Sequence, residues 1–269
     1  QARLVEVSPQ TDDTRAQTVS SVACPYDVAV VDIAHLAEYA AHGHAAEIGP
    51  DDLPGGPRDF LPSMAEAGRW RGVRYGVPFF ADAPLLYAKG AAEQVIDAVW
   101  RNAGGTSVRG AAVLQLADYE GGTVNLLEAA GGTGTAMFRD PERMPDGAEL
   151  AAVLRPAFDR WRDLLRQGVI DPASEEAREE EAFDRFRTAA APAVLRQWSS
   201  IHHRLSVDDR LRDPETGEPT FTVRPLPGGI LGGAVLAIAP DLPEERRRAA
   251  LSLVDHLTRP EVQAWLFAC

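Results

Sequence analysis

The chain switches repeatedly between short apolar runs and stretches with apolar residues at helical spacing. Residues 26–32 (YDVAVVD) form a nearly continuous apolar run rich in valine, which predicts a buried strand of a parallel sheet. Residues 33–43 then place apolar side chains at helical spacing and end on Gly43, which predicts a helix with a glycine cap. A strand, an acidic residue, a helix and a glycine together form the first half of an α/β unit.

The same two patterns continue along the rest of the chain. Residues 74–89 contain two apolar runs separated by residues 81–84. This pattern predicts two strands: the first ends one structural region, and the second begins another. Further strands are predicted within 108–117, 191–198 and 225–240. Helices are predicted at 90–101, 122–130, 147–168 (interrupted by Pro156 and capped by Gly168), 174–187 and, with a break near Pro260, 242–268.

This order of elements predicts an α/β fold with two lobes. Lobe 1 is expected to hold residues 1–84 and 233–269, and lobe 2 residues 85–232. The chain would cross between them at hinge segments near 82–85 and 229–234. Ligands of such folds bind in interdomain clefts and beyond the carboxyl ends of strands, so the sequence predicts a site in a cleft between the lobes.

Composition narrows the class of partner. The 269 residues are 45% hydrophobic and 25% charged, as is usual for a soluble globular protein. The formal net charge is −13, from 40 acidic and 27 basic residues, which argues against nucleic acid because that affinity comes from basic groups on phosphates. No apolar run is long enough to predict a membrane span.

The ends of the chain leave alternatives open. Cys24 and Cys269 match no metal-ligand spacing, and they form either one bridge or two unpaired thiols. The chain starts at Gln1 and shows no signal-peptide pattern. We therefore expect a processed or trimmed piece of a longer sequence.

An aromatic residue and a carboxylate stand side by side at the start of the helix within 114–134 (LQLADYEGGTVNLLEAAGGTG). Sugar sites combine carboxylates, which bond hydroxyl groups, with aromatic rings, which stack on the C–H face of the sugar ring. Tyr119 and Glu120 supply one of each. The alternative is structural: Glu120 interacts with the helix dipole, and Tyr119 packs as a hydrophobic staple.

Five blocks in order resemble the solute-binding proteins of ABC sugar importers. The first is YDVAVVDIAHLAEYAAHG, similar to a block of strand, aspartate, helix and glycine. YGVPFFADAPLLY is similar to the crossing of the family, and QLADYEGGTVNLLEAAGG to a block of its maltose/trehalose branch. FRTAAAPAVLRQW and the pair PLPGG…LGGAVLAIAP and AALSLVDHLTRPEVQAW complete the series.

The resemblance implies a two-lobed, type II periplasmic-binding-protein-like fold that closes on an oligosaccharide without catalysing a reaction. It implies no cofactor, an ABC permease as partner, an extracellular or cell-envelope location and a monomer. The family usually has a further strand and helix before the segment that starts at Gln1, and a longer helical segment after Cys269. The chain is thus expected to be either trimmed or a shortened relative.

Matching positions give further ligand-binding candidates. Asp82 matches an aspartate of the sugar cleft, although it also suits a turn before Pro84. Trp198 matches a tryptophan of the family, and the alternative is a core tryptophan. Asp32 ends a strand beside the expected cleft or caps the next helix.

The remaining candidates are His35, Gly232 and Gly233. Both glycines let the backbone approach a ligand or bend at the hinge. His35 stands where the family often has a tryptophan, and Ala88 where it has a second tyrosine. Both departures remove aromatic surface. Together with the missing terminal segments and the absent signal peptide, they motivate an alternative function as a diverged, intracellular sensor or scaffold domain of a larger regulatory protein.

Metal and catalytic sites are not expected. His202 and His203 are adjacent and point in different directions, which does not suit a shared metal ion. Five glutamates cluster within residues 175–181: Glu175, Glu176, Glu179, Glu180 and Glu181. We expect a solvated helix face here, not a calcium site, because no glycine-containing loop accompanies them. No hydrolase, zinc-protease or phosphate-loop motif occurs in the sequence, so we expect no enzyme.

Overall fold

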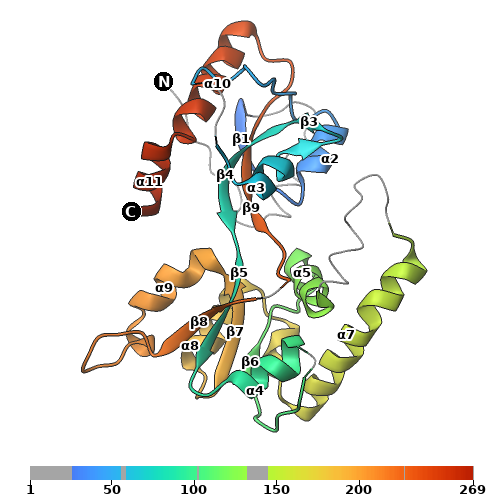
Figure 1. Cartoon of the computed structure of the whole chain (residues 1–269), viewed down its shortest axis with the longest axis vertical. Helices are drawn as coiled ribbons and strands as arrows, with labels where there is room; N and C mark the ends of the chain where they lie inside the picture. Colours follow the sequence, from blue (N-terminus) through green and yellow to red (C-terminus); the bar gives the residue numbers. More distant parts are fainter. Residues whose placement is uncertain (1–25, 56–58, 102, 132–144, 227, 269) are drawn as a thin grey trace. The chain divides into compact units, whose positions relative to one another are not determined.

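The computed structural model describes residues 26–55, 59–101, 103–131, 145–226 and 228–268. The chain divides into two compact units. Unit 1 comprises Gln1–Ala81 and Gly232–Cys269, and unit 2 comprises Asp82–Leu231. Figure 1 shows the elements of both units in the colours of the sequence.

Unit 1 contains a three-stranded sheet with the order β1-β9-β4. Its strands are β1 (Val28–Asp32), β4 (Gly76–Asp82, of which the last residue belongs to unit 2) and β9 (Gly232–Ile238). A two-stranded hairpin, β2 (Arg69–Trp70) and β3 (Val73–Arg74), stands apart from this sheet. The helices are α2 (Leu36–Ala41), α3 (Pro62–Ala67), α10 (Glu244–Leu257) and α11 (Pro260–Ala268).

The predicted parallel pairing of residues 26–32 is wrong for the described sheet. β1 runs antiparallel to β9, with Val31 opposite Val235. Within β1 only Val31 is buried, and Val30 is 51% exposed. A continuous apolar run indicates a strand, but the direction of its neighbour depends on β9, which lies near the other end of the chain and outside the local pattern.

The core of unit 1 lies on both faces of β9, because successive side chains of a strand point to opposite faces. Leu236 and Ile238 pack with Val254 and other residues of α10 on one face. Val235 and Ala237 pack with Leu36 and Tyr39 of α2 on the other. This double burial accounts for the unbroken apolar sequence of β9.

Unit 2 contains a four-stranded mixed sheet with the order β6-β7-β5-β8. β7 and β8 run antiparallel to β5, whereas β6 runs parallel to β7. The strands are β5 (Pro84–Lys89), β6 (Ala112–Val113), β7 (Ala193–Trp198) and β8 (Phe221–Pro225). The helices are α4 (Glu93–Ile96) with the π-turn η1 (Asp97–Arg101), α5 (Glu120–Ala129), α7 (Gly147–Gln167), α8 (Glu179–Thr188) and α9 (His202–Val207), with short 3₁₀ turns η2 (Pro172–Glu175), η3 (Ser199–Ile201) and η4 (Asp209–Leu211).

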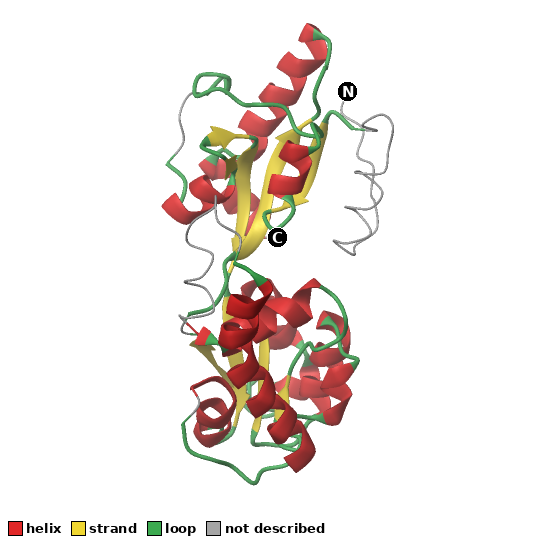
Figure 2. Cartoon of the chain, turned by 90° about the vertical axis from the view of Figure 1, so that its right-hand side faces the viewer, coloured by secondary structure: helices red, strands yellow, loops and turns green. Residues whose placement is uncertain are grey.

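Helices cover both faces of this sheet, as Figure 2 shows. Leu86 and Val194 pack on one face with residues of α4, η1 and α7, among them Trp161. Tyr87 and Leu195 pack on the opposite face with residues of α8 and α9. The sheet of unit 2 is therefore the middle layer of a helix–sheet–helix arrangement.

Three predicted elements differ in extent. The strand expected over 108–117 shrinks to β6, and the helix expected over 174–187 divides into η2 and α8. α7 continues through Pro156, which is exposed, because buried residues later in the helix hold it on the core. The predicted glycine caps are confirmed in backbone geometry, since Gly43 and Gly168 adopt φ values of 69° and 74°.

Candidate ligand-binding site

Four of the predicted ligand-binding residues lie in unit 2. Tyr119 and Glu120 stand at the start of α5, Trp198 ends β7, and Asp82 ends β4. Hydrogen bonds link three of these residues through their neighbours. Ser199, which follows Trp198, donates to Asp82. Gln197, which precedes Trp198, and Tyr119 both donate to Glu179. Unit 2 thus brings together residues from sequence regions that lie far apart.

Tyr119 is anchored to the start of α8. Its hydroxyl donates to Oε1 of Glu179 at 2.8 Å, and the Arg178 guanidinium lies 4.9 Å from its ring centre. Burial and the Glu179 carboxylate raise the pKa of Tyr119 well above its usual range. A Cβ added at Gly121 would overlap the Tyr119 ring, so the ring occupies the space that this glycine leaves.

Glu120 is the first residue of α5 and is half-buried. Tyr119, the N-cap residue, is extended, and its carbonyl accepts a bond from the Gly122 amide at 3.2 Å. A carboxylate in the first turn interacts favourably with the helix dipole, as the structural interpretation expects. The ligand contact of Glu120 stays a prediction.

The Trp198 ring is half-buried and packs against a cation. The Arg196 guanidinium carbon lies 4.0 Å from the ring centre, a distance typical of a cation–π contact. The backbone of Trp198 is also held, because its amide donates to Gln197 Oε1 at 3.0 Å and its carbonyl accepts from the Tyr87 hydroxyl at 3.0 Å. Two hydrogen bonds therefore hold the backbone of Trp198, and the Arg196 guanidinium packs on its ring.

A buried polar network contacts the Trp198 ring through Arg196, and the sequence predictions did not include it. Arg196 and Glu128 form a bidentate ion pair with distances of 2.7 and 2.8 Å. Gln115 donates to the Arg196 carbonyl at 2.7 Å, and Asn125 donates to Gln115 at 3.0 Å. Two signals pointed to it: polar residues inside the apolar run 191–198, and Asn125 and Glu128 three residues apart on one helix.

The Asp82 carboxylate bonds within the protein. It accepts from the hydroxyls of Ser199 and Ser200, both at 2.6 Å, and from the Ser200 amide at 3.0 Å. Asp82 is only 8% exposed. This carboxylate joins the end of β4 to the turn after β7, and its contact with a ligand stays a prediction.

The other four candidates lie in unit 1, at the end of its sheet where β1 stops and β9 begins. Asp32 starts the turn into α2, since its side chain accepts from the Ala34 amide at 2.9 Å and its carbonyl from the His35 amide at 3.0 Å. The Ile33 amide donates to the Gly233 carbonyl at 3.1 Å. The turn role of Asp32 is thus seen, and ligand contacts at this end stay predictions.

Gly233 has a backbone reason to be glycine. Its φ of 125° is unfavourable for other residues, and an added Cβ would overlap the Phe80 carbonyl. The neighbouring strand β4 therefore approaches β9 closely at this point. Gly232 and Gly233 open β9, so the proposed hinge role of this pair concerns the first residues of that strand.

The idea that Ala88 removes aromatic surface from a ligand site is wrong within unit 2. Ala88 is 3% exposed and belongs to the core on the α4 side of the sheet. Tyr87 is fully buried on the other side, where its ring lies 5.9 Å from that of Phe221. Because residues 87 and 88 both face the core, an aromatic ring at 88 would replace core volume instead of adding ligand surface.

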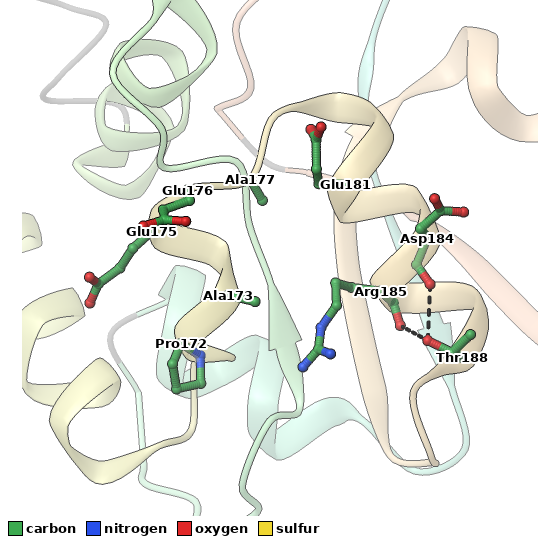
Figure 3. A pocket seen from close by; sticks show the side chains of 9 residues that line it. All are labelled: Pro172, Ala173, Glu175, Glu176, Ala177, Glu181, Asp184, Arg185 and Thr188. Atoms are coloured by element: carbon green, nitrogen blue, oxygen red, sulfur yellow. Dashed lines mark hydrogen bonds between the residues drawn. The ribbon is translucent and has the colours of Figure 1, made fainter.

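An open groove of about 820 Å³ lies between η2 and α8. Figure 3 shows Glu175 and Glu176 on one side of it and Glu181, Asp184 and Arg185 on the other. The Arg185 guanidinium bonds to the Asp171 carboxylate at 2.5 and 2.9 Å. The expected solvated face is confirmed for Glu175, Glu176, Glu180 and Glu181, which are exposed. Glu179 is half-buried and accepts a bond from the Tyr119 hydroxyl.

Neither a metal cluster nor a spanning helix occurs among the residues that the structure describes. No group of three or more histidines, cysteines, aspartates or glutamates there could hold a metal ion. Within the same residues no helix is long and apolar enough to cross a membrane. His202 packs 6.2 Å from the Tyr87 and Phe221 rings. Cys24 and Cys269 lie outside the described residues.

Comparison with known proteins shows the fold. No protein-family model matches the sequence, and a search of curated proteins finds no match. Among solved structures, maltose-bound MalE3 of T. maritima aligns with a TM-score of 0.64 and 21% identity, covering 96% of this chain and 69% of that one. The chain has the fold of solute-binding proteins. The predicted periplasmic-binding-protein-like α/β fold is confirmed.

Two further structures support the same fold. The GacH receptor of Streptomyces glaucescens, solved unliganded and with acarbose, has a TM-score of 0.65 at 19% identity, covering 94% of this chain and 66% of its own. UgpB from Mycobacterium tuberculosis, in complex with glycerophosphocholine, has a TM-score of 0.64 at 18% identity, covering 98% of this chain and 68% of its own. The chain spans about two thirds of the length of each of these proteins.

The solute-binding-protein fold does not decide between binding and catalysis. Thiaminase I of Clostridium botulinum, in complex with thiamin, also matches, with a TM-score of 0.57 and 13% identity over 88% of this chain and 67% of that one. Most of the similar structures are binding proteins. Function has to be argued from the site itself.

Proposed function

We propose that the chain binds an oligosaccharide without catalysis and serves ABC-type import. The observation that carries this proposal is the Trp198 ring, half-buried and held by Arg196, in a unit that also holds Tyr119 and Glu120. A fixed aromatic ring can stack on the C–H face of a sugar, and a nearby carboxylate can accept hydroxyl hydrogen bonds. The fold shared with maltose- and acarbose-binding proteins supports this choice of ligand class.

The proposal assigns different roles to the candidate residues. Trp198 stacks on the sugar, and Glu120 accepts from its hydroxyls. Tyr119 carries less of the ligand contact, since its hydroxyl already donates to Glu179. Asp32 and His35 contribute polar groups from unit 1, while the segments near 82–85 and 229–234, with Gly232 and Gly233, serve as hinges for closure on the sugar.

A thermal-shift screen with mono- to tetrasaccharides tests the proposal. A sugar at a hundred times its Kd stabilises the native state by about 2.7 kcal/mol. For a chain of this size this raises Tm by roughly 5–10 °C. Glu120→Ala should remove the shift, whereas Glu93→Gln, an exposed carboxylate elsewhere in unit 2, should retain it. No shift with any sugar at millimolar concentration contradicts the proposal.

Partner and location follow from the proposed function. We expect the sugar-loaded protein to be a monomer that is recognised by an ABC permease in the extracellular space or cell envelope. Nucleic acid is not expected to bind, because the net charge of −13 repels phosphates. Size-exclusion chromatography with light scattering, with and without sugar, tests the expected monomer.

The alternative function is a diverged sensor or scaffold domain. Its support is now narrower, because Ala88 lies in the core and only His35 remains as a position with lost aromatic surface. His35→Trp separates the two functions. Tighter sugar binding by this variant indicates a working site with a weaker contact, and no sugar binding by either form favours the alternative.

A further inference from the structure

The ion pair of Arg196 and Glu128 is the most deeply buried pair of charges that the structure describes. Their side chains are 1% and 0% exposed. Burying two charges costs several kcal/mol each, and apolar residues of similar volume are often as stable. Stability alone therefore gives a weak account of this pair, and its other contacts indicate what else it does.

On one side, the pair supports a predicted ligand contact. Arg196 lies two residues before Trp198, and its guanidinium carbon is 4.0 Å from the Trp198 ring centre. The two Glu128 oxygens fix the plane of the guanidinium by bonds at 2.7 and 2.8 Å. Because a stacked guanidinium restricts the ring that it covers, Glu128 influences Trp198 through Arg196.

On the other side, the pair contacts residues 229–231, the exit segment through which the chain leaves unit 2. Oε1 of Glu128 also accepts a bond from the Ile230 amide at 3.2 Å. Ile230 comes two residues before β9 begins at Gly232. Gly229, next to it, packs so closely on Pro84 that an added Cβ would overlap the proline ring. One carboxylate therefore contacts both the support of Trp198 and the exit segment.

We propose that Glu128 and Arg196 are positioning residues that couple the orientation of the Trp198 ring to the exit segment at Ile230. A change at the ring moves the guanidinium, and the shared carboxylate transmits this change to the Ile230 amide. Stacking of a sugar on Trp198 then stabilises one arrangement of the exit segment. Only this last step rests on the proposed function.

Amide hydrogen exchange in [15N]isoleucine-labelled protein tests the coupling without any ligand. Trp198→Ala should speed exchange of the Ile230 amide about fivefold, as expected for loss of roughly 1 kcal/mol of cation–π contact. Trp198→Phe should retain most of the protection, because it keeps a ring for Arg196. The Ile96 amide, bonded to Ala92 at 3.1 Å in α4, is the internal reference.

The result that overturns the proposal is equally specific. Unchanged exchange at Ile230 in Trp198→Ala, or an equal increase at Ile230 and Ile96, shows that the ring and the exit segment are not coupled. In Glu128→Leu/Arg196→Met, which lacks both charged groups, the tryptophan substitution should no longer change Ile230 exchange, whereas in Glu93→Gln its effect should stay intact.

A second measurement uses maltose as the probe. If maltose binds, it should slow Ile230 exchange in the original protein and not in Glu128→Leu/Arg196→Met, a variant that replaces both charges by apolar side chains of similar length. Equal slowing in both proteins overturns the coupling. If maltose does not bind, the failure concerns the proposed ligand, and the ligand-free measurement still decides the coupling.

Discussion

The hydroxyl of Tyr119 donates to Glu179 across 2.8 Å and joins the start of α5 to the start of α8. The two residues are separated by 60 positions in the chain. The bond fixes one of the two aromatic rings of the proposed site before any ligand is present. Because the bond needs no ligand, a substitution at Tyr119 should change the stability of the ligand-free protein.

Tyr119→Phe should lower the free energy of unfolding by about 1.5–3 kcal/mol, because it removes one hydrogen bond to a charged group and keeps the ring. Urea unfolding followed by circular dichroism measures this change. If Tyr119→Phe leaves the midpoint unchanged, the bond to Glu179 contributes nothing to the fold.

Gly121→Ala should lower the free energy of unfolding by about 1–3 kcal/mol, since the added Cβ overlaps the Tyr119 ring. Gly105→Ala is the matched control, because a Cβ there meets no atom within 4 Å. Thermal unfolding of both variants makes the comparison. A Gly121→Ala protein as stable as Gly105→Ala would show that the Tyr119 ring is free to move away.

Alkaline pH should unfold the protein as its buried tyrosines ionise in the unfolded chain. Burial raises the pKa of Tyr87 and of Tyr119 above the usual value of about 10. A raised folded pKa gives stability that is complete below the unfolded pKa and is lost as pH rises above it. Phenolate absorbance of these two residues should therefore appear together with unfolding, and Tyr87→Phe/Tyr119→Phe should remove that part of the signal. Titration of all tyrosines near pH 10 in folded protein contradicts this.

Asp82→Ala should destabilise unit 2 by about 2–3 kcal/mol, because it leaves the Ser199 and Ser200 hydroxyls without their shared acceptor. Asp118→Ala, an exposed aspartate in the same unit, serves as the control. Chemical unfolding provides the comparison. Equal stability of the two variants would favour a ligand role for Asp82 over the structural one.

Lys89→Met should destabilise the protein by about 2 kcal/mol. The Lys89 ammonium group donates to the carbonyls of Phe186, Arg187 and Ala189 at the end of α8, at distances of 2.6, 3.3 and 2.9 Å. Methionine retains the stem and loses these bonds. Burial lowers the pKa of Lys89, which is the only lysine of the chain.

Amine-specific labelling gives an independent measurement of the same residue. The Lys89 amine should react in unfolded protein and resist the reagent in native protein. Rapid labelling under native conditions would show that the end of α8 opens easily.

Much of the fold was predictable because it depends on local periodicity. The helical spacing of apolar residues in α10 and the apolar run of β9 can each be recognised within a short stretch of sequence. Pro156 was misleading, since a proline usually breaks a helix, but here the buried face of α7 outweighs its cost. Tyr119 was selected as a candidate by its residue type beside Glu120 at the start of a helix, and Trp198 by its match to a tryptophan of the resembled family; the ligand contacts of both stay predictions.

The sequence by itself determined the α/β class and the type and order of the longer elements, because their buried faces repeat apolar residues at a regular spacing. It did not predict the short elements α3, β2, β3, α9 and β8. Only the tertiary structure decided that β1 pairs antiparallel with β9, that Ala88 lies in the core, and that Arg196 meets Glu128 across 68 positions. Contacts of this kind join side chains whose own surroundings in the chain are unrelated. Their energy depends on distance in space, which the local pattern does not encode.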